Sequence, residues 1–124
     1  MLTGKYKAGA PPPAGSRAVS PEMSGFLGRL MTDDVLAKVD RLRPIAEQAG
    51  MSLPHLALAW VLRRPELASA IVGASRPEQV RSNAAASGVV LADDVIDAID
   101  EALAGVVIRG PSLAAFAQEG VKHR

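Results

Sequence analysis

One stretch of the chain, between residues 71 and 83, has the residue types and spacing of an anion-binding turn. The end of an apolar strand, a tight turn and a helix N-terminus together expose free backbone N–H groups and the positive end of a helix dipole. Gly73 would let a ligand approach the backbone closely, Ser75 offers a hydroxyl donor, and Arg76 offers a guanidinium suited to phosphate oxygens. The stretch is therefore a candidate phosphate-binding site.

Two side-chain amides follow this turn. Gln79 and Asn83 are about one helical turn apart, so they share a helix face that could meet a base or a ribose. A second interpretation fits the spacing better: Ser75 is an ordinary helix N-cap, and Arg76 and Gln79 are solvated. The residues alone leave both interpretations open.

Residues 68–73, Ala-Ser-Ala-Ile-Val-Gly, are the one convincing strand in the chain. The segment is short and apolar with β-branched residues at its centre, as in strands buried on both faces of a parallel sheet. Such a strand needs neighbours for its backbone N–H and C=O groups, and the chain supplies no second strand of similar quality. The sequence therefore predicts part of an α/β protein, with the other strands in residues outside this chain or in a partner.

Four helices are predicted around this strand. The first lies between Thr32, a good N-cap, and Gly50, and Pro44 should kink or split it. The second is capped by Ser52 and is apolar on nearly every side, which predicts burial between two layers. The other two are predicted over residues 77–87 and 93–104.

The two ends of the chain have weaker patterns. Residues 1–31 are rich in glycine and contain Pro11-Pro12-Pro13, which predicts either a flexible leader or a long loop that covers something. The proline run could also be a peptide ligand, although a stiff loop segment fits better. After Gly105, residues 106–108 could be extended, and residues 113–119 could form a weak helix.

The composition of the chain argues against several classes of protein. The chain has 124 residues, with 14 Lys and Arg against 13 acidic residues, and this balance gives no electrostatic reason to expect nucleic acid or anionic lipid as a partner. The absence of cysteine excludes disulfides and thiolate chemistry. No apolar run reaches the roughly 20 residues of a bilayer helix, and no signal peptide is visible. We therefore expect a soluble cytoplasmic protein.

Four motifs occur in an order and spacing that resemble the C-terminal half of the aldo/keto reductases. They are Leu2-Thr3-Gly4-Lys5-Tyr6, then Ser16-Arg17, then Ser52-Leu53-Pro54 with the helix to Leu62, and finally Gly73-Ala74-Ser75 with Glu78-Gln79 and Asn83. The resemblance covers about residues 1–104 and is strongest to the subgroup that includes the potassium-channel β subunits and related bacterial reductases.

The resemblance implies the C-terminal portion of a (β/α)8 TIM barrel, a fold of the α/β class. Residues 1–31 would be a cofactor-covering loop, residues 32–104 the last helices and last barrel strand, and residues 105–124 a C-terminal tail. Within the barrel, residues 68–73 would be the last strand.

The resemblance also implies a cofactor, NADP(H), and a role for each candidate residue. Lys5 and Arg17 would contact the pyrophosphate and the loop that clasps the cofactor, although without the resemblance both would be assigned to loop solubility. The 2′-phosphate and ribose would be bound by Ser75 and Gln79, with Arg76 helping. Gly73 would line the site, and Asn83 would face the adenine. In many relatives a Glu before this Asn contacts the adenine amino group, and this chain departs from that pattern with Ser82.

The implied activity is the NADPH-dependent reduction of an aldehyde or ketone to an alcohol. The catalytic Tyr, Lys, Asp and His of the family belong to the first half of the barrel, and nothing in this chain replaces them. Tyr6 belongs to the cofactor loop, and His55 and His123 are best explained as structural or solvated. We therefore expect this chain alone to be inactive. We also expect it to self-associate through the exposed faces of a half-barrel.

Two other functions and a metal site are alternatives for parts of this sequence. A truncated nucleotide-binding remnant without activity would keep the same cofactor residues. A helix-turn-helix DNA-binding module could be formed by residues 45–62, but its second helix is apolar where a recognition helix is polar and basic. Asp93, Asp94 and Asp97 are most simply the acidic start of a helix, and two histidines so far apart form no metal motif.

Overall fold

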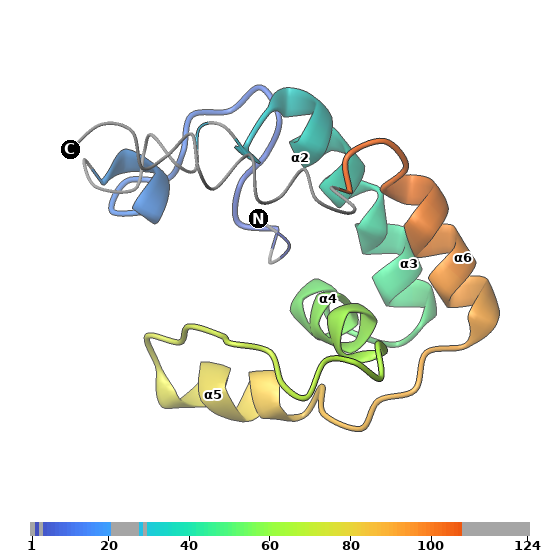
Figure 1. The fold of residues 1–124 in the computed structure, drawn as a ribbon. Helices are drawn as coiled ribbons and strands as arrows, with labels where there is room; N and C mark the ends of the chain where they lie inside the picture. The colour runs from blue at the N-terminus through green and yellow to red at the C-terminus, as the bar shows by residue number, and fades with distance from the viewer. Residues whose placement is uncertain (1, 3, 21–27, 29, 108–124) are drawn as a thin grey trace.

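The computed structural model describes residues 2, 4–20, 28 and 30–107. Within these residues the structure is helical. Its elements are the 3-10 helix η1 (Arg17–Val19) and the α-helices α2 (Asp33–Asp40), α3 (Leu42–Gln48), α4 (Leu53–Leu62), α5 (Pro77–Ala84) and α6 (Asp93–Ala102). Helices α3 and α6 lie side by side, α4 packs against α3, and α5 packs against α4 (Figure 1). The fold is thus a layer of α2, α3 and α6, with α4 against it and α5 beyond.

The first predicted helix is divided in two, as its proline requires. The Thr32 hydroxyl oxygen accepts a hydrogen bond from the Val35 N–H at 3.3 Å, so Thr32 caps α2 as predicted. The helix ends at Asp40, which lies four residues before Pro44, because Pro44 has no N–H to donate to that carbonyl. The second half, α3, ends before Gly50, whose φ of +66° is the left-handed conformation expected of a terminating glycine.

The core forms where α3, α4 and α6 meet. Ser52 caps α4 by accepting a hydrogen bond from the His55 N–H at 3.4 Å, as predicted. One face of α4 is completely buried through Leu56 and Ala59, and Ile99 of α6 is buried in the same cluster. The opposite face of α4 is only half-buried, so the prediction that this helix is enclosed between two layers is met on one side alone.

A polar cluster joins α4 to α6 beside this core. The Trp60 indole N–H donates to an Asp100 carboxylate oxygen at 3.2 Å, and the Arg63 guanidinium lies 3.6 Å from the same carboxylate. The Arg63 guanidinium also lies 4.3 Å from the centre of the Trp60 ring, within the range of a cation–π contact. These contacts fix the C-terminal end of α4 against α6.

The strand predicted over residues 68–73 is not formed in the structure. The segment has no regular secondary structure, and Ile71 is fully exposed. A strand exists only where neighbouring strands pair with its backbone, and the described residues contain none. The segment is not helical either, so the apolar sequence is left exposed without a sheet. The predicted extension at 106–108 and the weak helix at 113–119 lie wholly or partly outside the described residues.

Candidate functional site

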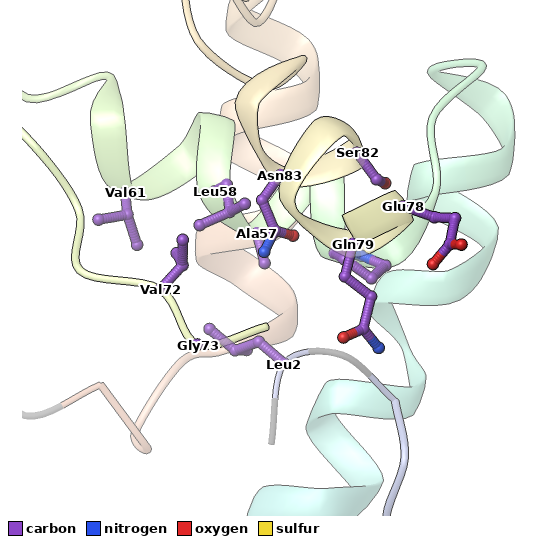
Figure 2. A pocket seen from close by; sticks show the side chains of 11 residues that line it. Leu2, Ala57, Leu58, Val61, Val72, Gly73, Glu78, Gln79, Ser82 and Asn83 are labelled. Atoms are coloured by element: carbon purple, nitrogen blue, oxygen red, sulfur yellow. The ribbon is translucent and has the colours of Figure 1, made fainter. Parts of the chain in front are cut away.

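The candidate site is a pocket of about 700 Å³ between α4, α5 and the segment that precedes α5 (Figure 2). Its two sides differ in chemistry. The apolar side comprises Leu2, Ala57, Leu58, Val61 and Val72. The polar side comprises Glu78, Gln79, Ser82 and Asn83, all of which belong to α5. A pocket with an apolar floor and a few polar groups along one wall is typical of small-molecule sites.

Three of the residues singled out in the sequence line this pocket together. They are Gly73, Gln79 and Asn83. Figure 2 shows Asn83 pointing from α5 toward Ala57 and Leu58 of α4, whereas Gln79 lies nearer the end of α5 that follows Gly73. The structure thus gathers both amides and the glycine around one cavity.

The turn before α5 differs from the alternative interpretation in which Ser75 is the N-cap. Arg76 occupies the N-cap position, with extended backbone and no capping hydrogen bond from its side chain. Ser75 lies one residue earlier and is bonded to Gln79. Its backbone N–H donates to Gln79 Oε1 at 2.8 Å, and its hydroxyl lies 3.2 Å from the same oxygen. The two donors of Ser75 therefore converge on one acceptor oxygen.

A shallow hollow lies on the other side of this turn. Its lining includes Ser75, Arg76 and Arg81. Both arginines are exposed, so the hollow carries two positive charges beside the Ser75 hydroxyl. Arg81 was missed in the sequence because helical spacing did not place it with the two amides. The fold of the turn brings it to the same hollow as Ser75.

The two candidate cations Lys5 and Arg17 belong to the N-terminal loop, far in sequence from the turn before α5. Lys5 is exposed, between the half-buried Gly4 and the buried Tyr6. Arg17 opens η1, and its side chain is outside what the structure describes. Lys5 is not among the described residues that line the pocket, although Leu2 from the same loop is. The structure therefore brings Leu2, at the start of this loop, to the pocket wall, but not Lys5.

His55 has a position that the sequence did not indicate. Its Nε2 contacts the backbone carbonyl of Ser82 and lies 3.0 Å from the Ser82 hydroxyl, which ties the first turn of α4 to α5. A contact between residues so distant in sequence has no local signal. The contact agrees with a structural role for this histidine.

No cluster of three or more His, Cys, Asp or Glu residues with metal-binding geometry occurs in the described part of the chain. No helix in that part is long and apolar enough to cross a membrane. His123 lies outside the described residues.

Comparison with known proteins gives matches along most of the chain. The profile of the aldo/keto reductase family matches residues 1–104. A probable voltage-gated potassium channel subunit beta from Arabidopsis thaliana is 39% identical over 105 residues, which cover 83% of this chain and 32% of the relative. A putative subunit of the same kind from Schizosaccharomyces pombe is 39% identical over 108 residues, covering 83% of this chain and 30% of the relative.

A reductase is also among the relatives. The L-glyceraldehyde 3-phosphate reductase of Escherichia coli O157:H7 is 30% identical over 105 residues, covering 84% of this chain and 30% of the relative. The chain thus spans about a third of the length of these curated relatives. The family implies a TIM-barrel fold, and the described residues of this chain are helical. Because the family profile extends over residues 1–104, this chain belongs to the aldo/keto reductase family.

Proposed function

We propose that this chain is the C-terminal part of an NADPH-dependent aldo/keto reductase and that it supplies residues that bind NADP(H). The complete protein would reduce a small aldehyde or ketone to an alcohol. The observation that carries the proposal is the turn at Ser75, whose two donors converge on Gln79 Oε1 beside a pocket lined by Gly73 and Asn83.

The residues at this turn fit the phosphorylated ribose of the cofactor. The N–H and the hydroxyl of Ser75 both donate to one oxygen atom, Gln79 Oε1. The same two donors could bond to one oxygen of a phosphate. The exposed guanidinium of Arg76 adds positive charge at the same place. In this proposal Ser75, Arg76 and Gln79 bind the 2′-phosphate and ribose. The single phosphate monoester at that position is what distinguishes NADP from NAD.

The remaining roles follow the family. Lys5 and Arg17 would hold the pyrophosphate, Gly73 would allow close approach of the cofactor to the backbone, and Asn83 would face the adenine. When bound, the nicotinamide supplies the hydride for carbonyl reduction. Ser82 is too short to extend as far as the Glu found at this position in many relatives. Adenine selectivity in this chain therefore depends chiefly on Asn83.

The groups that carry out proton transfer in the family are proposed to lie in the part of the relatives that this chain does not cover. Tyr6 does not offer a replacement, because it is buried in the N-terminal loop. The chain alone is therefore proposed to bind the cofactor without reducing a carbonyl. A cytoplasmic location is proposed as well, since a chain without cysteine is suited to a reducing compartment.

Self-association is proposed through the surface that the other barrel strands would cover. The exposed apolar residues around the unpaired segment include Leu67, Ile71, Val72 and Val80. The half-buried face of α4 lines the same pocket as Val72. Exposed apolar patches of this kind drive association in water.

Calorimetric titration of the chain with two nucleotides tests the cofactor proposal. Adenosine 2′,5′-bisphosphate should bind more tightly than adenosine 5′-monophosphate, because only the former offers the 2′-phosphate. Ser75→Ala should weaken binding of the bisphosphate by roughly tenfold or more. Ser87→Ala, at an exposed position past the end of α5, is the matched control and should have no effect. Equal affinity for the two nucleotides would overturn the proposal.

A further inference from the structure

The N-terminal loop is attached to the helical layer by an arginine that the proposed function does not use. The Arg43 guanidinium of α3 donates a hydrogen bond from NH2 to the Gly4 carbonyl at 2.9 Å. Gly4 directly precedes Lys5, the loop cation. The contact joins residues 39 positions apart, so it fixes the loop to an element that is otherwise remote from it in sequence.

The Arg43 guanidinium is itself held in place. Its Nε donates to the Asp40 carboxylate at 3.0 Å, and Asp40 is the last residue of α2. The two hydrogen bonds use different nitrogens of one planar group, so the ion pair with Asp40 also sets the direction of the bond to Gly4. The loop is therefore attached to the junction between α2 and α3.

Glycine is required at position 4 for two independent reasons. Its φ is +69°, a left-handed conformation that favours glycine. A Cβ atom at this position would lie 2.7 Å from Arg43 NH2 and 3.0 Å from Leu53 Cδ2, so a side chain would displace the guanidinium. The close approach of the loop backbone to α3 and α4 depends on the absence of a side chain here.

The residues on either side of this contact reinforce it. Leu2 packs against the hydrophobic core, and the Tyr6 side chain is 8% exposed. Lys5 lies between the half-buried Leu2 and the buried Tyr6 and is itself exposed. The loop is thus held at Leu2, Gly4 and Tyr6, and its one cation in this stretch is left free to meet a ligand.

We propose that Arg43 is a positioning residue for cofactor binding: through the Gly4 carbonyl it fixes the backbone that presents Lys5, without touching the cofactor itself. This inference rests on the proposed function, in which Lys5 meets the pyrophosphate of NADP(H). A loop that is already ordered loses less conformational entropy when a ligand binds, so the anchor raises affinity without adding a contact.

Two nucleotides separate this role from a general effect on the fold. NADPH has the pyrophosphate, whereas adenosine 2′-monophosphate has the 2′-phosphate and adenine but no pyrophosphate. Arg43→Ala should weaken NADPH binding by about tenfold and leave binding of the monophosphate unchanged. Arg41→Ala, at the neighbouring exposed arginine, is the matched control and should change neither. Equal losses for both nucleotides would overturn the inference.

A double-mutant cycle tests whether Arg43 acts through Lys5. If it does, Arg43→Ala should have little further effect on NADPH binding in a chain that already has Lys5→Ala. Full additivity of the two losses would contradict the inference.

Amide hydrogen exchange tests whether Arg43 anchors the loop, separately from whether the chain binds NADP(H). Arg43→Ala should accelerate amide exchange at residues 5–7 and leave the amides of α6 unchanged. Unchanged exchange at residues 5–7 would show that Arg43 does not anchor the loop, whatever binds there. Failure of the unsubstituted chain to bind either nucleotide, together with the expected exchange result, would refute the cofactor role and leave the anchor established.

Discussion

Gln79 Oε1 lies 2.8 Å from the backbone nitrogen of Ser75 and 3.2 Å from its hydroxyl oxygen. The amide oxygen thus occupies both donors that the proposed function assigns to a phosphate. Binding of a phosphate at this turn requires Gln79 to rotate away or to share the donors. Changing the charge of the Gln79 side chain therefore tests whether a phosphate binds at this turn.

Replacing Gln79 by glutamate should reduce the affinity for nucleotides that carry a 2′-phosphate. A carboxylate keeps the shape of the amide and still accepts from Ser75, but it places a negative charge beside the phosphate. We expect a loss of more than about tenfold for adenosine 2′,5′-bisphosphate, measured by calorimetry. The same change at exposed Gln48, at the end of α3, is the control. An unchanged affinity in Gln79→Glu would mean that Gln79 lies away from the phosphate.

Replacing Ser82 by glutamate should increase selectivity for adenine. The longer side chain would restore the carboxylate that many relatives place against the adenine amino group. Hypoxanthine lacks that amino group, so the ratio of affinities for NADPH and its hypoxanthine analogue should rise by about tenfold. Ser87→Glu supplies the same charge outside the pocket. A ratio that stays constant would place the adenine elsewhere, as would an equal rise in the Ser87 variant.

Removing the Asp100 carboxylate should destabilise the packing of α4 on α6. Asp100→Ala leaves the Trp60 N–H without this acceptor and the Arg63 guanidinium without this ion pair, for an expected loss of about 1–2 kcal/mol in the free energy of unfolding. Trp60 is the only tryptophan in the chain, so its fluorescence reports the change directly. Asp97→Ala, an exposed aspartate of the same helix, should have little effect. Comparable losses in the two variants would contradict the assigned role.

The chain alone should not reduce carbonyl compounds. With NADPH and a generic aldehyde, we expect no oxidation of the cofactor above background in an absorbance assay, because the family's proton-transfer residues are proposed to lie outside this chain. Tyr6→Phe is the decisive control. Turnover by the chain that disappears in Tyr6→Phe would show that the catalytic assignment is wrong.

Local features of the fold were predictable from the sequence. The caps at Thr32 and Ser52, the interruption caused by Pro44 and the terminating Gly50 all lie where predicted. Each depends on hydrogen bonds or backbone conformations within a few residues, which side-chain type alone can specify. The same holds for the start of α5 at Pro77.

The turn of the candidate site was predictable only in part. The sequence indicated that Gly73, Gln79 and Asn83 share one site, and they line one pocket. It did not show that Arg76 rather than Ser75 occupies the N-cap, nor that Arg81 joins Ser75 at the neighbouring hollow. Those details depend on backbone angles that several residue types can adopt.

Sequence by itself determined the helices, the caps of α2 and α4 and the family, because these follow from short-range patterns and from motifs in a fixed order. Tertiary structure alone decided that residues 68–73 form no strand, since strand pairing depends on partners that a local pattern cannot supply. It alone also brought Arg43 to Gly4 and His55 to Ser82. Contacts between residues far apart in the chain arise from helix packing, and no short stretch of sequence specifies them.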